Sequence, residues 1–282
     1  YYNWEELKGG FDWNDDITNR NNQIHLGGIK VFADGSVSGQ TAWVDPPFLG
    51  TNNYGISTTN EDVLLAAGEE AKKQGVQLLV HAMGEQAIDI VVDTFYGKEA
   101  WLSDAPSVRV EHAAMPTEQA IKRAAQSGIG FVPQPIFLYA EIESYLKNLG
   151  HDRTKTTYPI QTMIDAGIKV AFSSDAPATS WADPANPFVG IKAAVTRVAY
   201  DGTDVGQEHR VDIETAITLY TSAAQEMSRI PNIGQLAPGY FADFIVLDQD
   251  ILEISADQID KINVAKTYMG GQLIYEREKA MK

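Results

Sequence analysis

The sequence predicts an α/β fold in which parallel βα units are followed by a small β module. Short apolar runs alternate with helical patterns up to residue 174, and strands alternating with helices of this length imply parallel βαβ connections. From residue 234 onward, the helical pattern gives way to strand-like runs. The chain has 282 residues, 44% of them hydrophobic, which is enough for one sizeable core with a small appended module.

Five apolar runs are the expected strands of the parallel sheet. They span residues 29–33, 77–82, 107–112, 129–132 and 169–174. Helical patterns separate these runs, over 60–73 and about 85–96, and a further helix is expected to open at 116–118, where a proline suits the first turn. Three glycines are placed where helices should end, namely Gly75, Gly128 and Gly167.

The pattern changes after the fifth expected strand. Asn186-Pro187 predicts a helix N-cap followed by a first-turn proline, and this helix should run to about Tyr200. A second long amphipathic helix is expected over 211–229.

The tail of the chain has strand signals. Apolar runs cover 241–247 and 265–275, and Gly270-Gly271 is typical of a hairpin turn. We therefore expect two parts, an α/β part over residues 1–230 and a β module over residues 231–282.

Charge and composition exclude several classes of protein. Lys and Arg number 22 against 38 Asp and Glu, a net charge of −16 that disfavours nucleic acids and anionic membrane surfaces as partners. No stretch approaches the roughly 18 apolar residues of a membrane-spanning helix, and the N-terminus lacks the pattern of a signal peptide, so we expect a cytoplasmic protein. The chain has no Cys, so a metal would be held by His, carboxylate or modified Lys.

Three of the expected strands end in a residue that can bind a metal ion, namely His81, His112 and Asp175. In a βα barrel every strand delivers its C-terminal end to the same face, so these side chains should converge although they are far apart in sequence. Taken singly, His81 reads as a core residue and Asp175 as a turn residue before Ala-Pro. Together they are typical of a metal-dependent hydrolase.

Glu111 and His112 are neighbours in one expected strand. Strand alternation sends adjacent side chains to opposite faces. We expect His112 to face the barrel mouth and Glu111 to pair outside.

Five segments then occur in an order that carries a family resemblance. They are Gly28-Ile29-Lys30-Val31-Phe32-Ala33-Asp34-Gly35-Ser36, His81-Ala82-Met83-Gly84-Glu85-Gln86-Ala87, Val110-Glu111-His112-Ala113, Ser174-Asp175-Ala176-Pro177 and Gly239-Tyr240-Phe241-Ala242-Asp243-Phe244-Ile245-Val246-Leu247. The chain resembles the amidohydrolase superfamily, in particular the amidohydrolase 3 branch of YtcJ-like and N-substituted formamide deformylase-like proteins. The resemblance implies a metal-dependent (β/α)8 barrel beside a small β-sandwich, and hydrolysis of C–N bonds in small amide-type or formamide-like substrates.

The resemblance also implies roles for four residues. His81 and His112 would bind one metal ion, and Asp175 would contact metal, take a proton from a metal-activated water and pass it to the leaving nitrogen. Lys30 would be carbamylated and bridge two metals; the alternative is a side chain that reaches solvent beyond the strand end, because a charged Lys is costly to bury. The expected cofactor is one or two divalent ions, zinc first, with iron or manganese as alternatives.

One departure from the family pattern shapes the domain prediction. Family members begin with a β-sandwich segment and a first barrel strand that carries a His-x-His pair, which is absent from this sequence. The five expected strands correspond to about strands 4 to 8 of the barrel, and the sequence begins with Tyr1 rather than Met. We therefore expect a fragment of a longer enzyme: a partial catalytic barrel over 1–230 and part of the sandwich over 231–282.

An incomplete barrel would have an open sheet edge. Such an edge favours pairing with another chain, so we expect a homo-oligomer or association with the missing N-terminal segment. Without the His-x-His pair, metal affinity and activity of this chain should fall.

Further residues are expected near the site. Gln134, Tyr139 and Trp181 follow strand ends and are expected to line a substrate pocket. The remaining His residues are interpreted as structural or surface residues, namely His25, His151 and His209.

Two other functions are compatible with the sequence. The chain could be a non-catalytic or regulatory protein with the same fold, which the missing His pair favours. It could also be a barrel enzyme that uses Lys30 as a Schiff-base nucleophile, although such chemistry needs no set of His, His and Asp at strand ends.

Overall fold

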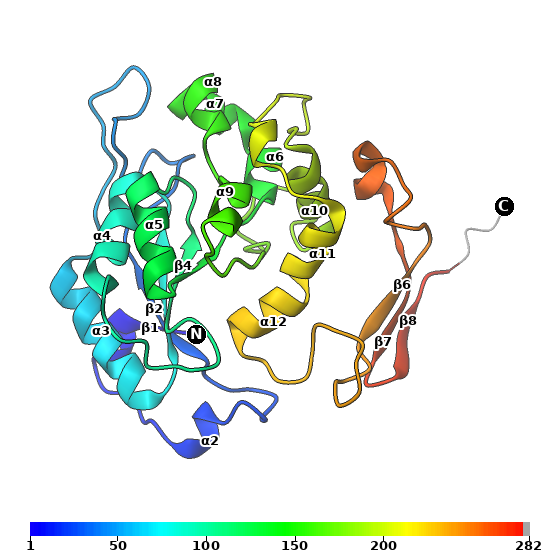
Figure 1. Ribbon diagram of the computed structural model, residues 1–282, viewed down its shortest axis with the longest axis horizontal. Helices are drawn as coiled ribbons and strands as arrows, with labels where there is room; N and C mark the ends of the chain where they lie inside the picture. Colours follow the sequence, from blue (N-terminus) through cyan, green and yellow to red (C-terminus); the bar gives the residue numbers. More distant parts are fainter. Residues whose placement is uncertain (279–282) are drawn as a thin grey trace.

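A parallel five-stranded sheet organises the larger part of the molecule, seen in a computed structural model that describes residues 1–278 (Figure 1). The strands follow one another in chain order, and every pairing is parallel. They are β1 (Tyr2–Asn3), β2 (Gly28–Phe32), β3 (Gln77–Ala82), β4 (Val108–His112) and β5 (Gly130–Val132). The expected fold class is confirmed, and all carboxyl ends of these strands lie at one edge of the sheet.

Three helices pack side by side next to strands β2 to β4: the first contacts β2 and β3, the second contacts β3 and β4, and the third contacts the second (Figure 1). They are α3 (Glu61–Gln74), α4 (Glu85–Phe95) and α5 (Glu118–Ser127). The predicted caps are confirmed for two of them. The Asn60 side chain accepts a hydrogen bond from the backbone N–H of Val63, and α3 and α5 end at Gly75 and Gly128 in the left-handed conformation, which glycine adopts without steric cost.

The fifth expected strand is reduced to a single bridge. Val170 pairs in parallel with Phe131, whose N–H donates to the Lys169 carbonyl at 3.0 Å and whose carbonyl accepts from the Ala171 N–H at 3.2 Å. The segment therefore lies where the sequence predicts it, next to β5, although its ladder is short. Conversely, β1 was not predicted, because two residues are too few for a periodic signal.

Short helices lie between the longer predicted elements, and the last of the four after β5 is the helix expected to end near Gly167. Between β5 and the bridge at Val170 lie α6 (Ile136–Ala140), α7 (Ile142–Leu149), α8 (His151–Lys155) and α9 (Ile160–Asp165); near the start of the chain lie α1 (Trp4–Leu7) and α2 (Asp15–Thr18). At four to eight residues each, they are too short to show a helical hydrophobic period.

The two long helices expected after residue 186 are shorter than predicted. Helix α10 (Pro187–Thr196) ends at Arg197, whose φ of 51° lies in the left-handed region. The expected helix over 211–229 is broken at Thr221 (φ −119°, ψ −95°) into α11 (Ile213–Tyr220) and α12 (Ser222–Ser228). A 3₁₀ turn, η1 (Gln207–His209), precedes them.

The β module is a three-stranded antiparallel sheet beside α10 and α11 (Figure 1). Its strands are β6 (Phe244–Leu247), β7 (Val264–Met269) and β8 (Gln272–Glu276), and Gly270 and Gly271, both at positive φ, form the expected hairpin turn. The 3₁₀ turn η2 (Ala256–Lys261) joins the module to the body, where Lys192 Nζ of α10 lies 3.0 Å from Asp260 Oδ1. Within residues 1–278, no helix combines the length and apolar character needed to cross a membrane.

The buried Arg197 side chain connects two loops, at residues 157–158 and 205–206, by hydrogen bonds. The side chain is 1% exposed, and its guanidinium donates to the carbonyls of Thr157 (2.8 Å), Tyr158 (3.1 Å), Val205 (2.5 Å) and Gly206 (3.0 Å). Burial lowers the pKa of Arg197 to about 10, which leaves it charged at neutral pH. The left-handed backbone that ends α10 directs this side chain between the two loops.

We expect Arg197→Met to lower the free energy of unfolding by about 3 kcal/mol, because it removes a buried hydrogen-bonded cation and leaves the carbonyls of Thr157 and Val205 without a donor. Arg197→Lys should recover only part of this, since an ammonium lacks the planar fork that reaches acceptors on two sides. Urea unfolding checks both variants against Arg210→Met, an exposed arginine. Equal stability of Arg197→Met and Arg210→Met would contradict the assignment.

Candidate functional site

The two histidines predicted as metal ligands lie against each other at the carboxyl edge of the parallel sheet. His81 is the fifth residue of β3 and His112 the last of β4. Their ring centroids are 4.4 Å apart and the rings are tilted by 68°. Phe32 flanks His81 on one side, with centroids 5.3 Å apart, and Phe137 flanks His112 on the other, with centroids 5.7 Å apart.

His112 reaches this position through an unusual backbone conformation. Its φ is 73°, in the left-handed region that a non-glycine residue adopts at a cost. The turn at the strand end brings the imidazole toward His81, which regular alternation would not do. His112 is 5% exposed, and burial, followed by the nearby His81 and Lys30, holds its pKa well below the ordinary value.

Glu111 does not pair outside, so that expectation is wrong. It is in register with His81 of β3, and laterally paired residues in a sheet point to the same side. Its Oε1 accepts a hydrogen bond from Nε of Arg109 at 2.5 Å on that same face. Although burial opposes the charge, Glu111 holds the pKa of Arg109 above its ordinary value.

Asp34 fixes the loop beside His81. Its carboxylate is 3% exposed and accepts backbone N–H donors from Trp43 (2.9 Å), Met83 (3.0 Å) and Gly84 (2.8 Å). His81 Nε2 lies 3.3 Å from Asp34 Oδ1 and 2.8 Å from the Gly35 carbonyl. A carbonyl can only accept, so Nε2 carries the proton and Nδ1 keeps its lone pair.

Asp175 approaches the histidine pair from the segment that follows the bridge at Val170. Its φ of 51° is again left-handed, and its Oδ2 lies 4.0 Å from His112 Nε2. The side chain is 42% exposed, so it can meet a molecule from solvent. Burial raises the pKa of Asp175, while Lys30 and His81 lower it.

Lys30 lies on the same face of the sheet as Arg109, because both residues are in register with Leu79 of β3. Its Nζ is 5.2 Å from the centroid of the Phe32 ring. Burial lowers the pKa of Lys30, Glu111 raises it and Arg109 lowers it again. The ammonium therefore faces charged groups of the site instead of extending freely into water.

The three residues predicted to line a substrate pocket fall into two groups. Gln134 is 1% exposed, and its Nε2 donates to the Val132 carbonyl (2.7 Å) and to Ser173 Oγ (2.8 Å). Tyr139 and Trp181 pack against each other, with ring centroids 5.1 Å apart, and both contact Tyr200. Tyr139 is 6% exposed, so Trp181 covers it from solvent.

The other histidines lie apart from this pair. His25 Nδ1 is 3.2 Å from the Asn22 carbonyl, His209 Nδ1 is 3.4 Å from Thr162 Oγ1, and His151 is exposed at the start of α8. These positions agree with the structural or surface interpretation.

Sequence reasoning missed the Arg109–Glu111 pair and the structural role of Asp34. A signal for the pair was present, because Arg109 and Glu111 alternate with Val108 and Val110 and give the strand one apolar and one charged face. For Asp34 there was no such signal, since its backbone partners follow only from the folded loop.

The donor types suit a divalent metal ion, but the number of donors is small. The described residues bring together two imidazoles and one carboxylate. Within residues 1–278, no group of three or more His, Cys, Asp or Glu side chains is arranged to hold an ion. His112 Nδ1, which is buried and has no hydrogen-bond partner there, shows that the polar groups of the site are not fully satisfied by one another.

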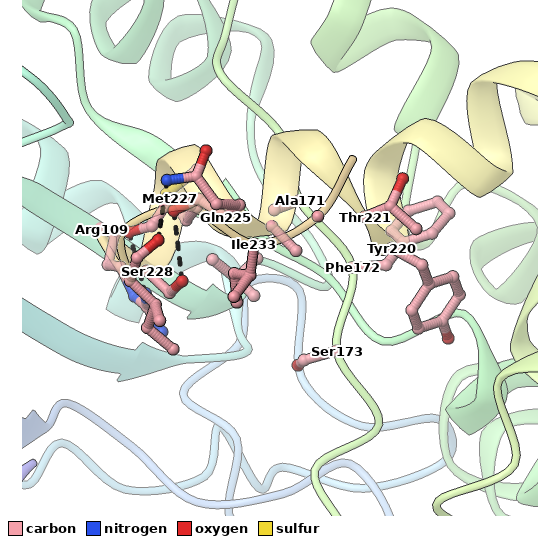
Figure 2. A pocket seen from close by; sticks show the side chains of 14 residues that line it. Arg109, Ala171, Phe172, Ser173, Tyr220, Thr221, Gln225, Met227, Ser228 and Ile233 are labelled. Carbon is pink, nitrogen blue, oxygen red and sulfur yellow. Dashed lines mark hydrogen bonds between the residues drawn. The ribbon is translucent and has the colours of Figure 1, made fainter. Parts of the chain in front are cut away.

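A cavity of about 350 Å³ has Arg109 in its wall (Figure 2). Its lining includes Val132, Ser173 and Tyr220, and Arg109 donates to the Met227 carbonyl at 3.2 Å there. His81, His112 and Asp175 are not among the lining residues. The cavity therefore adjoins Arg109 and Ser173 but is not lined by the two histidines or Asp175.

The chain is similar to several known proteins. A family model described as "Amidohydrolase family" matches residues 2–275. The chain is 30% identical to YtcJ of Bacillus subtilis (strain 168) over 90% of this chain and 48% of that protein, and 29% identical to N-substituted formamide deformylase of Arthrobacter pascens over 81% and 41%. The chain thus spans about half the length of the curated relatives it matches or less.

A solved structure shares the fold. The crystal structure of an uncharacterized metal-dependent hydrolase from Pyrococcus horikoshii OT3 superposes with a TM-score of 0.73 at 26% sequence identity, covering 84% of this chain and 47% of that one.

We expect Asp34→Ala to lower the free energy of unfolding by about 3 kcal/mol, because it leaves three buried N–H groups without an acceptor. Urea unfolding of this variant, compared with the exposed Asp12→Ala, checks the loss. If the two variants unfolded at the same urea concentration, Asp34 would not hold the loop.

The depressed pKa of His112 predicts a pH effect on the stability of the metal-free protein. The unfolded imidazole takes up a proton below about pH 6.5 that the folded one does not, so stability is full above that pH and falls as pH falls, by up to about 1.4 kcal/mol per unit. Urea unfolding with a chelator at pH 7.5 and 5.5 should show a smaller loss for His112→Gln than for the unchanged protein. An identical loss would contradict the assignment.

Proposed function

The chain belongs to the amidohydrolase family, and from this premise we propose that it carries catalytic residues of a metal-dependent hydrolase of C–N bonds in small amides or formamides. The observation that carries the proposal is the meeting of His81, His112 and Asp175, from three separate segments, at the carboxyl edge of the sheet. The similarity to N-substituted formamide deformylase and to the Pyrococcus horikoshii metal-dependent hydrolase supports the bond type and the metal.

His81 and His112 are the proposed metal ligands. His81 presents the lone pair of Nδ1, because its Nε2 proton is given to the Gly35 carbonyl. His112 is neutral at neutral pH, because burial and the neighbouring His81 and Lys30 lower its pKa. A divalent ion bound there would lower the pKa of a water molecule and polarise a substrate carbonyl. Zinc is the first choice, with iron or manganese as alternatives and one or two ions in total.

Asp175 is the proposed general base. Its carboxylate is partly exposed and lies beside the histidine pair, so it can accept a proton at Oδ2 from an attacking water. The same oxygen can then give the proton to the leaving nitrogen as the C–N bond breaks. The raised pKa of Asp175 makes it a better proton acceptor than an exposed aspartate.

Lys30 is proposed to complete the donor set as a carbamate. It shares the site with Glu111 and Asp175, and burial lowers its pKa, which increases the fraction of neutral amine that can react with carbon dioxide. The carbamate would replace a half-buried cation by an oxygen donor. With His81, His112 and Asp175, the carbamate would give four donors, the number that zinc usually takes in proteins.

The remaining parts of the proposal concern organisation. We propose that residues 1–230 form the catalytic part and residues 231–282 the β module. All five side chains of β8 are exposed, among them Leu273, Ile274 and Tyr275, which favours association with a second copy or with a further segment of polypeptide. Tyr139 and Trp181 are proposed to line the approach to Asp175.

A second candidate function is a non-catalytic protein with this fold. It is favoured by one observation, that no set of three His, Cys, Asp or Glu ligands occurs within residues 1–278. Metal binding separates the two candidates.

We expect the purified protein to bind zinc in isothermal titration calorimetry, and His81→Asn and His112→Asn to weaken binding at least 10-fold. His209→Asn is the matched control and should bind like the unchanged protein. Asp175→Asn should lower the rate of hydrolysis of N-formyl and N-acyl amines at least 100-fold, the usual contribution of a general base. A folded protein whose zinc affinity is the same in all three histidine variants would support the non-catalytic function instead.

A further inference from the structure

Two buried polar atoms without partners lie on adjacent strand ends of the site. Within residues 1–278, neither His112 Nδ1 nor Gln134 Oε1 has a hydrogen-bond partner, and both are shielded from solvent. A buried polar atom without a partner costs free energy, so each such atom needs a physical explanation. His112 Nδ1 donates a hydrogen bond when it carries a proton, whereas Gln134 Oε1 can only accept one.

The orientation of the Gln134 amide follows from its other contacts. Its Nε2 is 2.7 Å from the Val132 carbonyl, which can only accept, so the nitrogen and not the oxygen must occupy this position. The same nitrogen donates to Ser173 Oγ at 2.8 Å. Both amide protons are thereby used, and Oε1 is left to face a donor.

The His112 ring is next to this amide. Glu111, the residue before His112, is in register with Val132, two residues before Gln134, so the two side chains leave neighbouring strand ends. No hydrogen bond joins Nδ1 to Oε1 in the structure, so the ring or the amide must rotate for one to form.

We propose that Gln134 is a positioning residue that accepts the Nδ1 proton of His112 and so leaves His112 Nε2 unprotonated on the side of Asp175. This inference rests on the proposed function, because it assigns how one of the metal ligands is oriented. His112 Nε2 lies 4.0 Å from Asp175 Oδ2, so this tautomer directs a lone pair into the space between the two residues.

The two histidines would then be held in opposite tautomers. His81 gives its Nε2 proton to the backbone carbonyl of Gly35 and keeps the lone pair on Nδ1. His112 gives its Nδ1 proton to a side chain and keeps the lone pair on Nε2. An acceptor that fixes the second ring nitrogen of a metal-binding histidine typically changes metal affinity 10- to 100-fold.

Gln134 also connects three strand ends. It follows β5, bonds to Ser173 two residues before Asp175, and lies next to the end of β4, because Glu111 is in register with Val132. With its side chain 1% exposed and both amide protons used, it has no donor left for a substrate. The positioning role therefore replaces the substrate-binding role expected from sequence.

Nitrogen-15 NMR of histidine-labelled, metal-free protein at pH 8 tests the proposal, because the chemical shifts of the two ring nitrogens report which one is protonated. The unchanged protein should show His112 protonated at Nδ1, with the signal assigned from its absence in His112→Gln. Gln134→Leu should shift His112 toward the Nε2-protonated form and weaken zinc binding 10- to 100-fold. Gln134→Glu, which restores an acceptor, should keep the Nδ1-protonated form.

Gln77→Leu is the matched control. Gln77 is also fully buried, donates through Nε2 to a carbonyl, that of Pro106, and has an unpartnered Oε1, but it lies at the opposite end of β3. It should lose stability without changing the His112 signal or the zinc affinity.

The outcomes separate this inference from the proposed function. If His112 is protonated at Nε2 in the unchanged protein, the positioning role is overturned. It is also overturned if His112 gives the same signals in Gln134→Leu as in the unchanged protein. The expected tautomer change without any zinc binding supports the positioning role and overturns the proposed hydrolase.

Discussion

The parallel register of β2, β3 and β4 is the constraint on which the rest of the structure depends. It aligns Phe32, His81 and Glu111 in one row across the sheet and places His112 at the next position of its strand. Because parallel strands end at one edge, residues more than 30 positions apart come within contact of each other there. A slip of one residue in β4 would turn its alternating set of side chains to the other face and remove Glu111 and Arg109 from the site.

The site contains buried charged side chains, which are stable there because opposite charges are paired. Arg109 and Glu111 pair at 2.5 Å, and the pair lies close to Lys30, whose pKa burial lowers. Removing one partner of such a pair leaves an uncompensated charge, which is far more costly than removing both. The left-handed backbone at His112 and Asp175 adds further local strain, and such strain persists where the surrounding structure fixes it. Backbone hydrogen bonds next to the two residues provide that fixing: the Ala113 N–H donates to the Ala82 carbonyl and the Ala178 N–H donates to the Asp175 carbonyl.

Much of this organisation could be predicted from sequence, for physical reasons. Strands and helices with full periodic patterns, such as 77–82 and 61–74, are found where expected, because apolar spacing and caps such as Asn60 and Gly75 are local signals. Short helices such as α6 to α9 give no periodic signal, and the break at Thr221 depends on tertiary context. In the site, His81, His112 and Asp175 were predictable from their place at strand ends. The inward position of Glu111 and the contacts of Gln134 were not, since they depend on strand pairing and on one positive φ.

The central claim is that His81 and His112 together bind a divalent metal ion beside Asp175. Anomalous diffraction at the zinc absorption edge, from crystals of this protein grown with zinc, tests it most directly. The account predicts a peak about 2.1 Å from both His81 Nδ1 and His112 Nε2, with Asp175 turned toward it. Crystals in which both rings keep their positions and the zinc peak is absent, or lies at His25 or His209 instead, would contradict the account.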